Sequence, residues 1–153
     1  MTGHTATTQG NSRLVQLENI AIARELLTRL GSNAPPQHVL DLFADDMTWD
    51  VPGDPTAFPW IGRRAGSEAV RAFLVETKAQ LERVRFDVED VLASDTQAVI
   101  VGALASKVRR TGRVIETSFA IALTIDAGRI TRFRMLEDSF AVAQAAHGTA
   151  SAG

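Results

Sequence analysis

Residues 43–53, with the sequence FADDMTWDVPG, decide how the rest of the chain folds. The stretch reads as the end of a short helix, an acidic corner, a short β-prone strand over residues 47–51, and a turn that a Pro-Gly pair imposes. Asp50 lies where that strand ends. Its side chain is expected either to face a pocket at the strand end or to cap the turn, a frequent role of aspartate.

The chain before this stretch is predicted to be helical. Within residues 12–30, apolar side chains recur at spacings of three and four and mark one buried helix face; they are Leu17, Ile20, Ala23, Leu27 and Leu30. A proline pair interrupts this helix, and a short second helix over residues 38–43 follows. The acidic pair Asp45 and Asp46 is expected to stop that second helix.

The chain after the stretch changes from a helical to a strand period. Three prolines within residues 52–62 predict a loop without regular structure. A long helix is expected from a Ser67 cap to about residue 82. Strands with period two are then predicted over about residues 84–92, 97–109, 114–125 and 129–137, and a short terminal helix over residues 139–146.

This order predicts an α+β fold. Helices segregated on one side of an antiparallel sheet are typical of that class, and long strands curl through twist and bulges. We therefore expect a cone-shaped roll: a curled mixed, mostly antiparallel sheet, closed by N-terminal helices and one long helix, with one apolar cavity. A single domain over residues 13–146 is expected, with disordered tails over residues 1–12 and 147–153.

Composition narrows the function classes. The 153-residue chain has no cysteine, which excludes disulfides, thiolate metal sites and cysteine nucleophiles. Its net charge of −2 argues against nucleic acid as a partner. No apolar run approaches the roughly 20 residues of a membrane span, and no signal peptide is recognisable, so no membrane partner and a cytoplasmic location are expected. The three histidines are scattered, so no metal site is expected. No cofactor is expected for the function either.

Several motifs recur in an informative order: LFADD at residues 42–46, WDVPG at 49–53, PWIG at 59–62, GSEAVRAF at 66–73 and GRITRFR at 128–134. Together they resemble the SnoaL-like, or nuclear-transport-factor-like, superfamily over about residues 13–146. The resemblance implies the cone fold and a homodimer. This fold hosts ketosteroid isomerases, epoxide hydrolases, polyketide cyclases, dehydratases and non-catalytic binding modules, so it does not by itself name a reaction.

The active sites of these relatives carry over incompletely. The base of ketosteroid isomerases falls near Asp50, but the chain has no tyrosine and the oxyanion aspartate falls at Ala120 or Ile121. The Arg-x-Asp pair of limonene epoxide hydrolases is missing, and the last-strand acid of hydrolases and SnoaL-type cyclases falls at Met135. Asp50 is the acid that remains.

Two carboxylates are therefore the predicted catalytic groups. In an apolar cone, desolvation would raise the pKa of Asp50 and make it a usable acid or base. Glu137 shares the alternating face of Phe133 and Met135 and could place a second carboxylate at the pocket mouth; a solvated strand-end glutamate is the alternative. The predicted substrate-binding residues are those that line the cone or pack in its core: Trp49, Phe58, Trp60, Phe73, Leu104, Ser106, Val108, Ser118, Phe133 and Met135.

Three functions stay open at this point. The first is a small cofactor-independent enzyme of secondary metabolism that acts on an apolar oxygenated ligand, such as a polyketide, terpenoid or steroid-like molecule. It would catalyse isomerisation, cyclisation, dehydration (a lyase reaction) or epoxide opening (a hydrolase reaction) by general acid/base chemistry. The others are a non-catalytic ligand-binding protein and a dimeric interaction module of the same fold. An apolar cavity that contains Asp50 would favour the enzyme.

Overall fold

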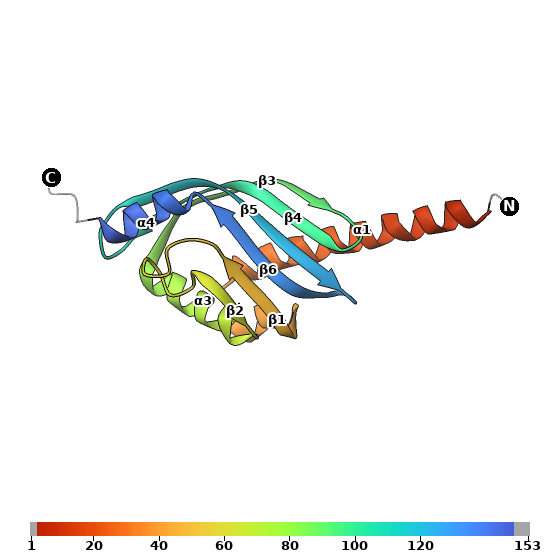
Figure 1. Cartoon of the computed structure of the whole chain (residues 1–153), viewed down its shortest axis with the longest axis horizontal. Coiled ribbons are helices and arrows are strands. Elements are labelled where there is room, and N and C mark those ends of the chain that lie inside the picture. The colour runs from red at the N-terminus through yellow and green to blue at the C-terminus, as the bar shows by residue number, and fades with distance from the viewer. Residues whose placement is uncertain (1–2, 149–153) are drawn as a thin grey trace.

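A curled six-stranded sheet with helices packed against it forms the body of the computed structural model, which describes residues 3–148 (Figure 1). The elements in chain order are α1 (Gly3–Leu30), α2 (Pro36–Leu40), β1 (Phe43–Val51), β2 (Gly62–Ala65), α3 (Glu68–Gln80), β3 (Leu81–Ala93), β4 (Gln97–Val108), β5 (Val114–Asp126), β6 (Arg129–Glu137) and α4 (Ser139–His147). The predicted α+β class and the mixed, mostly antiparallel sheet are confirmed.

The strand order is β2-β1-β6-β5-β4-β3. β1 pairs with β6 in parallel, and every other neighbouring pair is antiparallel. Because side chains alternate along a strand, the register decides which of them face the inside of the cone. Trp49 pairs with Phe133, and both are buried on the inner face. Their neighbours Asp50 and Arg134 are paired one position further on, so they lie on the outer face.

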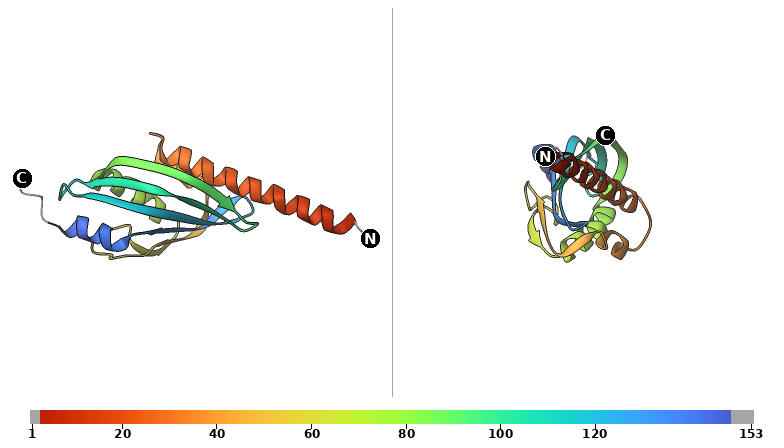
Figure 2. Two further views of the ribbon diagram at one scale, coloured as in Figure 1. Left: turned by 90° about the horizontal axis from the view of Figure 1, so that it is seen from above. Right: turned by 90° about the vertical axis from the view of Figure 1, so that its right-hand side faces the viewer.

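The helices close the inner side of the sheet. α1 packs against β3 and β4, and α3 follows β2 and contacts α2 (Figure 2). Gly102 on β4 leaves room for the neighbouring strands, because a Cβ there would collide with the Asp87 carbonyl oxygen and come within 2.9 Å of the Phe119 ring. Phe119 uses this space to stack on Phe86 at 4.9 Å between ring centroids. Among the described residues, no helix is both long and apolar enough to cross a bilayer.

The terminal regions differ from the prediction. α1 begins at Gly3, so residues 3–12 continue the helix instead of forming a disordered tail, and the helix projects beyond the sheet (Figure 1). This segment of the helix contains no proline, and Ser12 and Gln16 hydrogen-bond to Asp95 at 2.8 and 3.0 Å. Leu17 is 56% exposed, because Ala23 and Leu26 form the buried face. At the other end α4 extends to His147; residues 1–2 and 149–153 lie outside the described residues.

The region around the opening stretch also differs. Asp45 and Asp46 belong to β1, which begins at Phe43, and they are exposed where the pairing of β1 with β6 is irregular. β2 lies at the end of the predicted loop and pairs with β1, because an unpaired strand edge is satisfied by a second strand. Ser67 precedes α3 but makes no side-chain cap.

Candidate functional site

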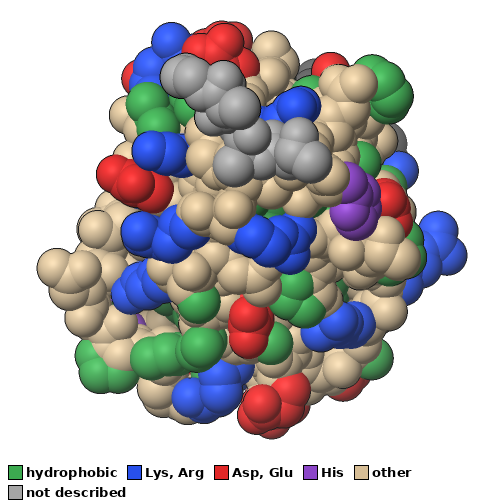
Figure 3. All heavy atoms as spheres, turned by 90° about the vertical axis from the view of Figure 1, so that its left-hand side faces the viewer, with side chains coloured by type: hydrophobic (Ala, Val, Ile, Leu, Met, Phe, Trp, Pro, Cys, Tyr) green, Lys and Arg blue, Asp and Glu red, His purple; other side chains and the backbone are tan. Residues whose placement is uncertain are grey.

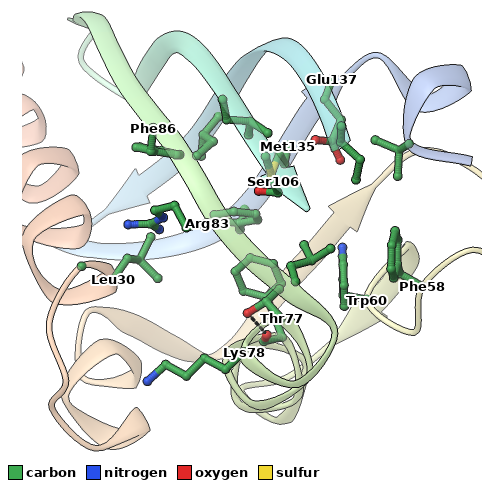
Figure 4. A pocket seen from close by; sticks show the side chains of 18 of the residues that line it. Leu30, Phe58, Trp60, Thr77, Lys78, Arg83, Phe86, Ser106, Met135 and Glu137 are labelled. Atoms are coloured by element: carbon green, nitrogen blue, oxygen red, sulfur yellow. Dashed lines mark hydrogen bonds between the residues drawn. The ribbon is translucent and has the colours of Figure 1, made fainter. Parts of the chain in front are cut away.

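A cavity of about 440 Å³ lies inside the cone, between the inner face of the sheet and the helices (Figure 4). Aromatic and aliphatic side chains make most of its wall: Leu30, Phe58, Trp60, Phe73, Leu81, Phe86, Leu104, Ile115, Ile121, Phe133, Met135 and Val142. Polar and charged groups interrupt it: Ser32, Asn33, Thr77, Lys78, Arg83, Ser106, Arg109 and Glu137. A mostly apolar cavity with a few polar groups is typical of a small-molecule site.

Trp49 supports this wall from behind. Its indole is 2% exposed and stacks on Phe133, with ring centroids 4.4 Å apart and planes 5° apart. Its Nε1 donates a hydrogen bond of 2.8 Å to the Trp60 carbonyl oxygen. That bond ties the loop between β1 and β2 to the sheet, and the loop places Phe58 and Trp60, stacked at 4.5 Å, in the cavity wall.

A hydrogen-bonded clasp joins the same loop to α4. Asp54 accepts a 2.7 Å hydrogen bond from the Thr56 hydroxyl, and His147 Nε2 lies 3.0 Å from the second Asp54 oxygen. Hydrogen bonds from the side chain and amide of Thr56 lower the pKa of Asp54 below its ordinary value. Figure 3, which views the end of the molecule where α4 lies, shows a histidine beside an acidic side chain. The clasp holds together the two segments that bring Phe58 and Val142 to the cavity.

Glu137 is the carboxylate in the cavity wall. It ends β6 on the inner face and pairs with Phe119 of β5. Burial raises the pKa of Glu137 from 4.5 to about 7, because desolvation penalises the charged form. No hydrogen bond or ion pair from any residue within 3–148 reaches its carboxyl group. At neutral pH the group is thus present in both protonation states, as a general acid or base requires.

Ser106 is a second polar group aimed at the cavity. It lies on β4 opposite Ile115, and both residues line the wall (Figure 4). Within the described part of the chain, its hydroxyl makes no hydrogen bond, so it is free to bind a ligand oxygen. Thr77 differs, since its hydroxyl already donates a 2.7 Å hydrogen bond to the Phe73 carbonyl oxygen.

Asp50, for which both a pocket role and a turn-cap role were expected, does not line this cavity. Asp50 is 7% exposed on the outer face of the sheet, opposite the cavity. Its oxygens lie 3.8, 3.5 and 3.9 Å from the guanidinium groups of Arg63, Arg132 and Arg134. No backbone amide in the described chain donates to it, so it does not cap the turn either. The physical reason is strand alternation: Trp49 takes the inward position, and its neighbour must point outward.

Three further predicted contacts lie elsewhere. Val108 packs in the core, Trp49 supports the wall without lining the cavity, and Ser118 is exposed on the outer face, paired with Ala103. The other predicted residues do line the cavity: Phe58, Trp60, Phe73, Leu104, Ser106, Phe133, Met135 and Glu137. The predicted set of site residues did not include the cations Lys78, Arg83 and Arg109, which also line the cavity. Bulges in β3, between Arg83 and Arg85 and between Val88 and Asp90, hide the inward phase of Arg83.

Among residues 3–148, no cluster of three or more histidine or carboxylate side chains is arranged to hold a metal ion. The candidate site is thus described by the apolar wall, the Glu137 carboxyl, the Ser106 hydroxyl and the three cations.

Comparison with known proteins agrees with this architecture. No curated protein matches the sequence significantly. An NTF2-like protein from Burkholderia xenovorans superposes with a TM-score of 0.78 and 24% identity over 86% of this chain and 98% of that chain. A candidate isomerase from Rhodopseudomonas palustris superposes with a TM-score of 0.66 and 22% identity over 97% of this chain and 99% of that chain. A candidate SnoaL-like polyketide cyclase from Jannaschia superposes with a TM-score of 0.71 and 16% identity over 88% of this chain and 94% of that chain.

At these identities the superpositions demonstrate a shared fold and no shared activity. The family match is more specific, because residues 23–133 match the model of the SnoaL-like domain. That range covers most of the body of the cone, from the buried part of α1 to the middle of β6. The chain therefore belongs to the SnoaL-like domain family and has its NTF2-like cone fold.

Proposed function

We propose that the protein is a cofactor-independent enzyme that uses Glu137 as a general acid/base on an apolar, oxygenated small molecule. The observation that carries the proposal is the half-buried Glu137 carboxyl in the wall of an apolar cavity, which has no hydrogen-bond or ion-pair partner among residues 3–148 and whose pKa is raised to about 7. A group with a pKa near the working pH both accepts and returns protons efficiently. Among the solved structures with this fold are a candidate isomerase and a candidate polyketide cyclase.

The proposed step begins with the ionised Glu137 carboxylate. It removes a proton from a carbon next to a ligand carbonyl, and the electron pair of the broken C–H bond moves to give an enolate. The Ser106 hydroxyl donates a hydrogen bond to the enolate oxygen. When the ligand is an unsaturated ketone, the enolate is conjugated and protonated Glu137 returns the proton to a different carbon, which is an isomerisation. Alternatively, the enolate carbon attacks a second carbonyl to close a ring, and Glu137 gives its proton to the alkoxide that forms. Ligands of polyketide or terpenoid type, with several carbonyl groups on an apolar body, suit this chemistry.

Deuterium exchange tests the proposal without knowledge of the natural substrate. A panel of cyclic ketones and β-diketones is incubated with protein in D₂O, and incorporation at the α-carbon is followed by mass spectrometry. We expect catalysed exchange with the wild type, a rate that rises with an apparent pKa near 7, and loss of exchange in Glu137→Gln. Glu116→Gln, on an exposed position of β5, is the matched control. Equal exchange in both variants, or ligands that bind without exchange, would overturn catalysis in favour of a binding protein.

We further propose that the protein forms a homodimer through the outer face of the sheet. Half-buried alanine and valine side chains lie in neighbouring register there, with Ala120 opposite Val101 and Ala122 opposite Val99, and half-buried Ala103 lies opposite the exposed Ser118. A patch of small side chains lets the same face of a second copy approach closely in a two-fold dimer. Light scattering coupled to gel filtration tests this, since Ala122→Glu should convert a dimer to a monomer; a monomeric wild type would refute it.

A further inference from the structure

Three cationic side chains line one part of the cavity: Lys78 on α3, Arg83 on β3 and Arg109 after β4. They gather around the junction of α3 and β3. The Arg109 amide donates a 3.0 Å hydrogen bond to the Gln80 carbonyl oxygen, and Arg83 pairs with Ser106 across the sheet. We call this group the cationic rim. Figure 4 shows Lys78 and Arg83 on one side of the cavity and Glu137 on the opposite side.

The cationic rim has no counter-charge within the described chain. Elsewhere the structure pairs many of its cations, with Arg29 bound to Glu25 at 2.8 Å and Arg85 to Asp87 at 3.1 Å. None of the three rim side chains forms such a pair with an acid among residues 3–148.

Arg83 is nevertheless held in place. Its guanidinium lies 5.0 Å from the ring centroid of Phe86, which also lines the cavity. A cation over an aromatic face is stabilised by the ring quadrupole.

Figure 3 shows Lys and Arg side chains gathered across the end of the molecule where the β4–β5 turn and α4 lie. Uncompensated cations at the edge of a low-dielectric cavity focus their field into it and raise the local concentration of anions.

We propose that the ligand is an amphipathic carboxylate: an apolar body that fills the cavity, an anionic end held by Lys78, Arg83 and Arg109, and an oxygenated carbon placed at Glu137. This inference rests on the proposed function for the position of the ligand and specifies its chemical class. The separation of the rim from Glu137 sets the polarity of binding, since a carboxylate beside the Glu137 carboxylate would be repelled.

A matched pair of fluorescent probes tests the anion preference. 8-Anilinonaphthalene-1-sulfonate carries one anionic group, and N-phenyl-1-naphthylamine has the same aromatic body without it. We expect wild-type protein to bind the sulfonate about tenfold more tightly, with a preference that weakens as salt is added. In the triple variant Lys78→Gln/Arg83→Gln/Arg109→Gln the preference should vanish, while binding of the neutral probe is unchanged.

Two control variants separate binding inside the cavity from binding that depends only on surface charge. Arg24→Gln/Lys107→Gln removes exposed cations that do not line the cavity, and should leave the preference intact. Met135→Trp fills the cavity and should abolish binding of both probes. Equal affinity of the wild type for both probes, or sulfonate binding that survives Met135→Trp, would overturn the proposal. A protein that prefers the anion but catalyses no deuterium exchange keeps this inference and loses the catalytic one, so the two failures are distinguishable.

Discussion

Replacement of Glu137 by glutamine should make stability less dependent on pH. Burial raises the pKa of Glu137 from 4.5 to about 7 in the folded chain, whereas in the unfolded chain the carboxyl titrates near its ordinary value. Between these values the folded state holds a proton that the unfolded state has released. The contribution of Glu137 to stability is therefore greatest below the unfolded pKa, falls as pH rises through this window, and stays low above pH 7.

The magnitude follows from the two pKa values. At 1.36 kcal/mol per pKa unit, the difference corresponds to about 3 kcal/mol of wild-type stability lost between acidic and mildly alkaline solution. Glutamine has nearly the same shape and no charge to desolvate. The free energy of unfolding of Glu137→Gln, relative to wild type, should thus increase by about 2.5 kcal/mol as pH rises from about 5 to about 8.

Urea denaturation of both proteins across this pH range measures the effect, with Glu116→Gln as a control on the exposed face of β5. A parallel titration by NMR of carbon-labelled glutamate would follow the Glu137 carboxyl directly. If the stability difference between wild type and Glu137→Gln stays constant with pH, the carboxyl titrates normally. Glu137 would then not be poised for proton transfer at neutral pH.

Three other substitutions probe the surroundings of the site. Asp50→Asn should leave any turnover unchanged, because the side chain faces away from the cavity, and should lower stability by about 1 kcal/mol in urea titrations as its arginine partners lose their carboxylate; reduced turnover would contradict the placement. Asp54→Asn should speed hydrogen exchange of the α4 amides. Unchanged exchange would mean that the clasp does not stabilise α4. Because hydrogen bonds from Thr56 lower the pKa of Asp54, the clasp contributes stability at pH values above the ordinary pKa of 3.8, and this stability is lost as pH falls through the lowered pKa. Gly102→Ala should cost about 1–3 kcal/mol in thermal unfolding, since the Phe119 ring fills the space of a side chain, and an unchanged midpoint would refute that crowding.

Periodicity and order predicted most of the fold. The helical period of α1, the strand period of β3 to β6 and the turns between them are local patterns, so the sequence carries them directly. β2 was missed because four residues of a strand have no clear period of their own. Its existence depends on pairing with β1, which is a long-range contact.

The site residues also differ in whether a local sequence pattern predicts them. Phe133, Met135 and Glu137 all line the cavity, because they alternate along one regular strand. The same alternation applied to residues 49 and 50 would have turned Asp50 outward once Trp49 was assigned to the core. Arg83 was not predictable in this way, because a bulge shifts the phase of β3 at that point. The raised pKa of Glu137 depends on burial among segments distant in sequence, which no local pattern reveals.

The parallel pairing of β1 with β6 has a consequence for how the molecule assembles. Trp49 finds its stacking partner in Phe133, far along the chain, and contacts of such large sequence separation form slowly, since a long loop must close first. During synthesis from the N-terminus, one edge of β1 is covered by β2, the next strand, but the other edge must wait for β6, the last strand of the chain. The wall of the cavity is therefore completed late in folding. Substitutions where β1 pairs with β6 should slow folding of the protein more than those within the β4–β5 hairpin.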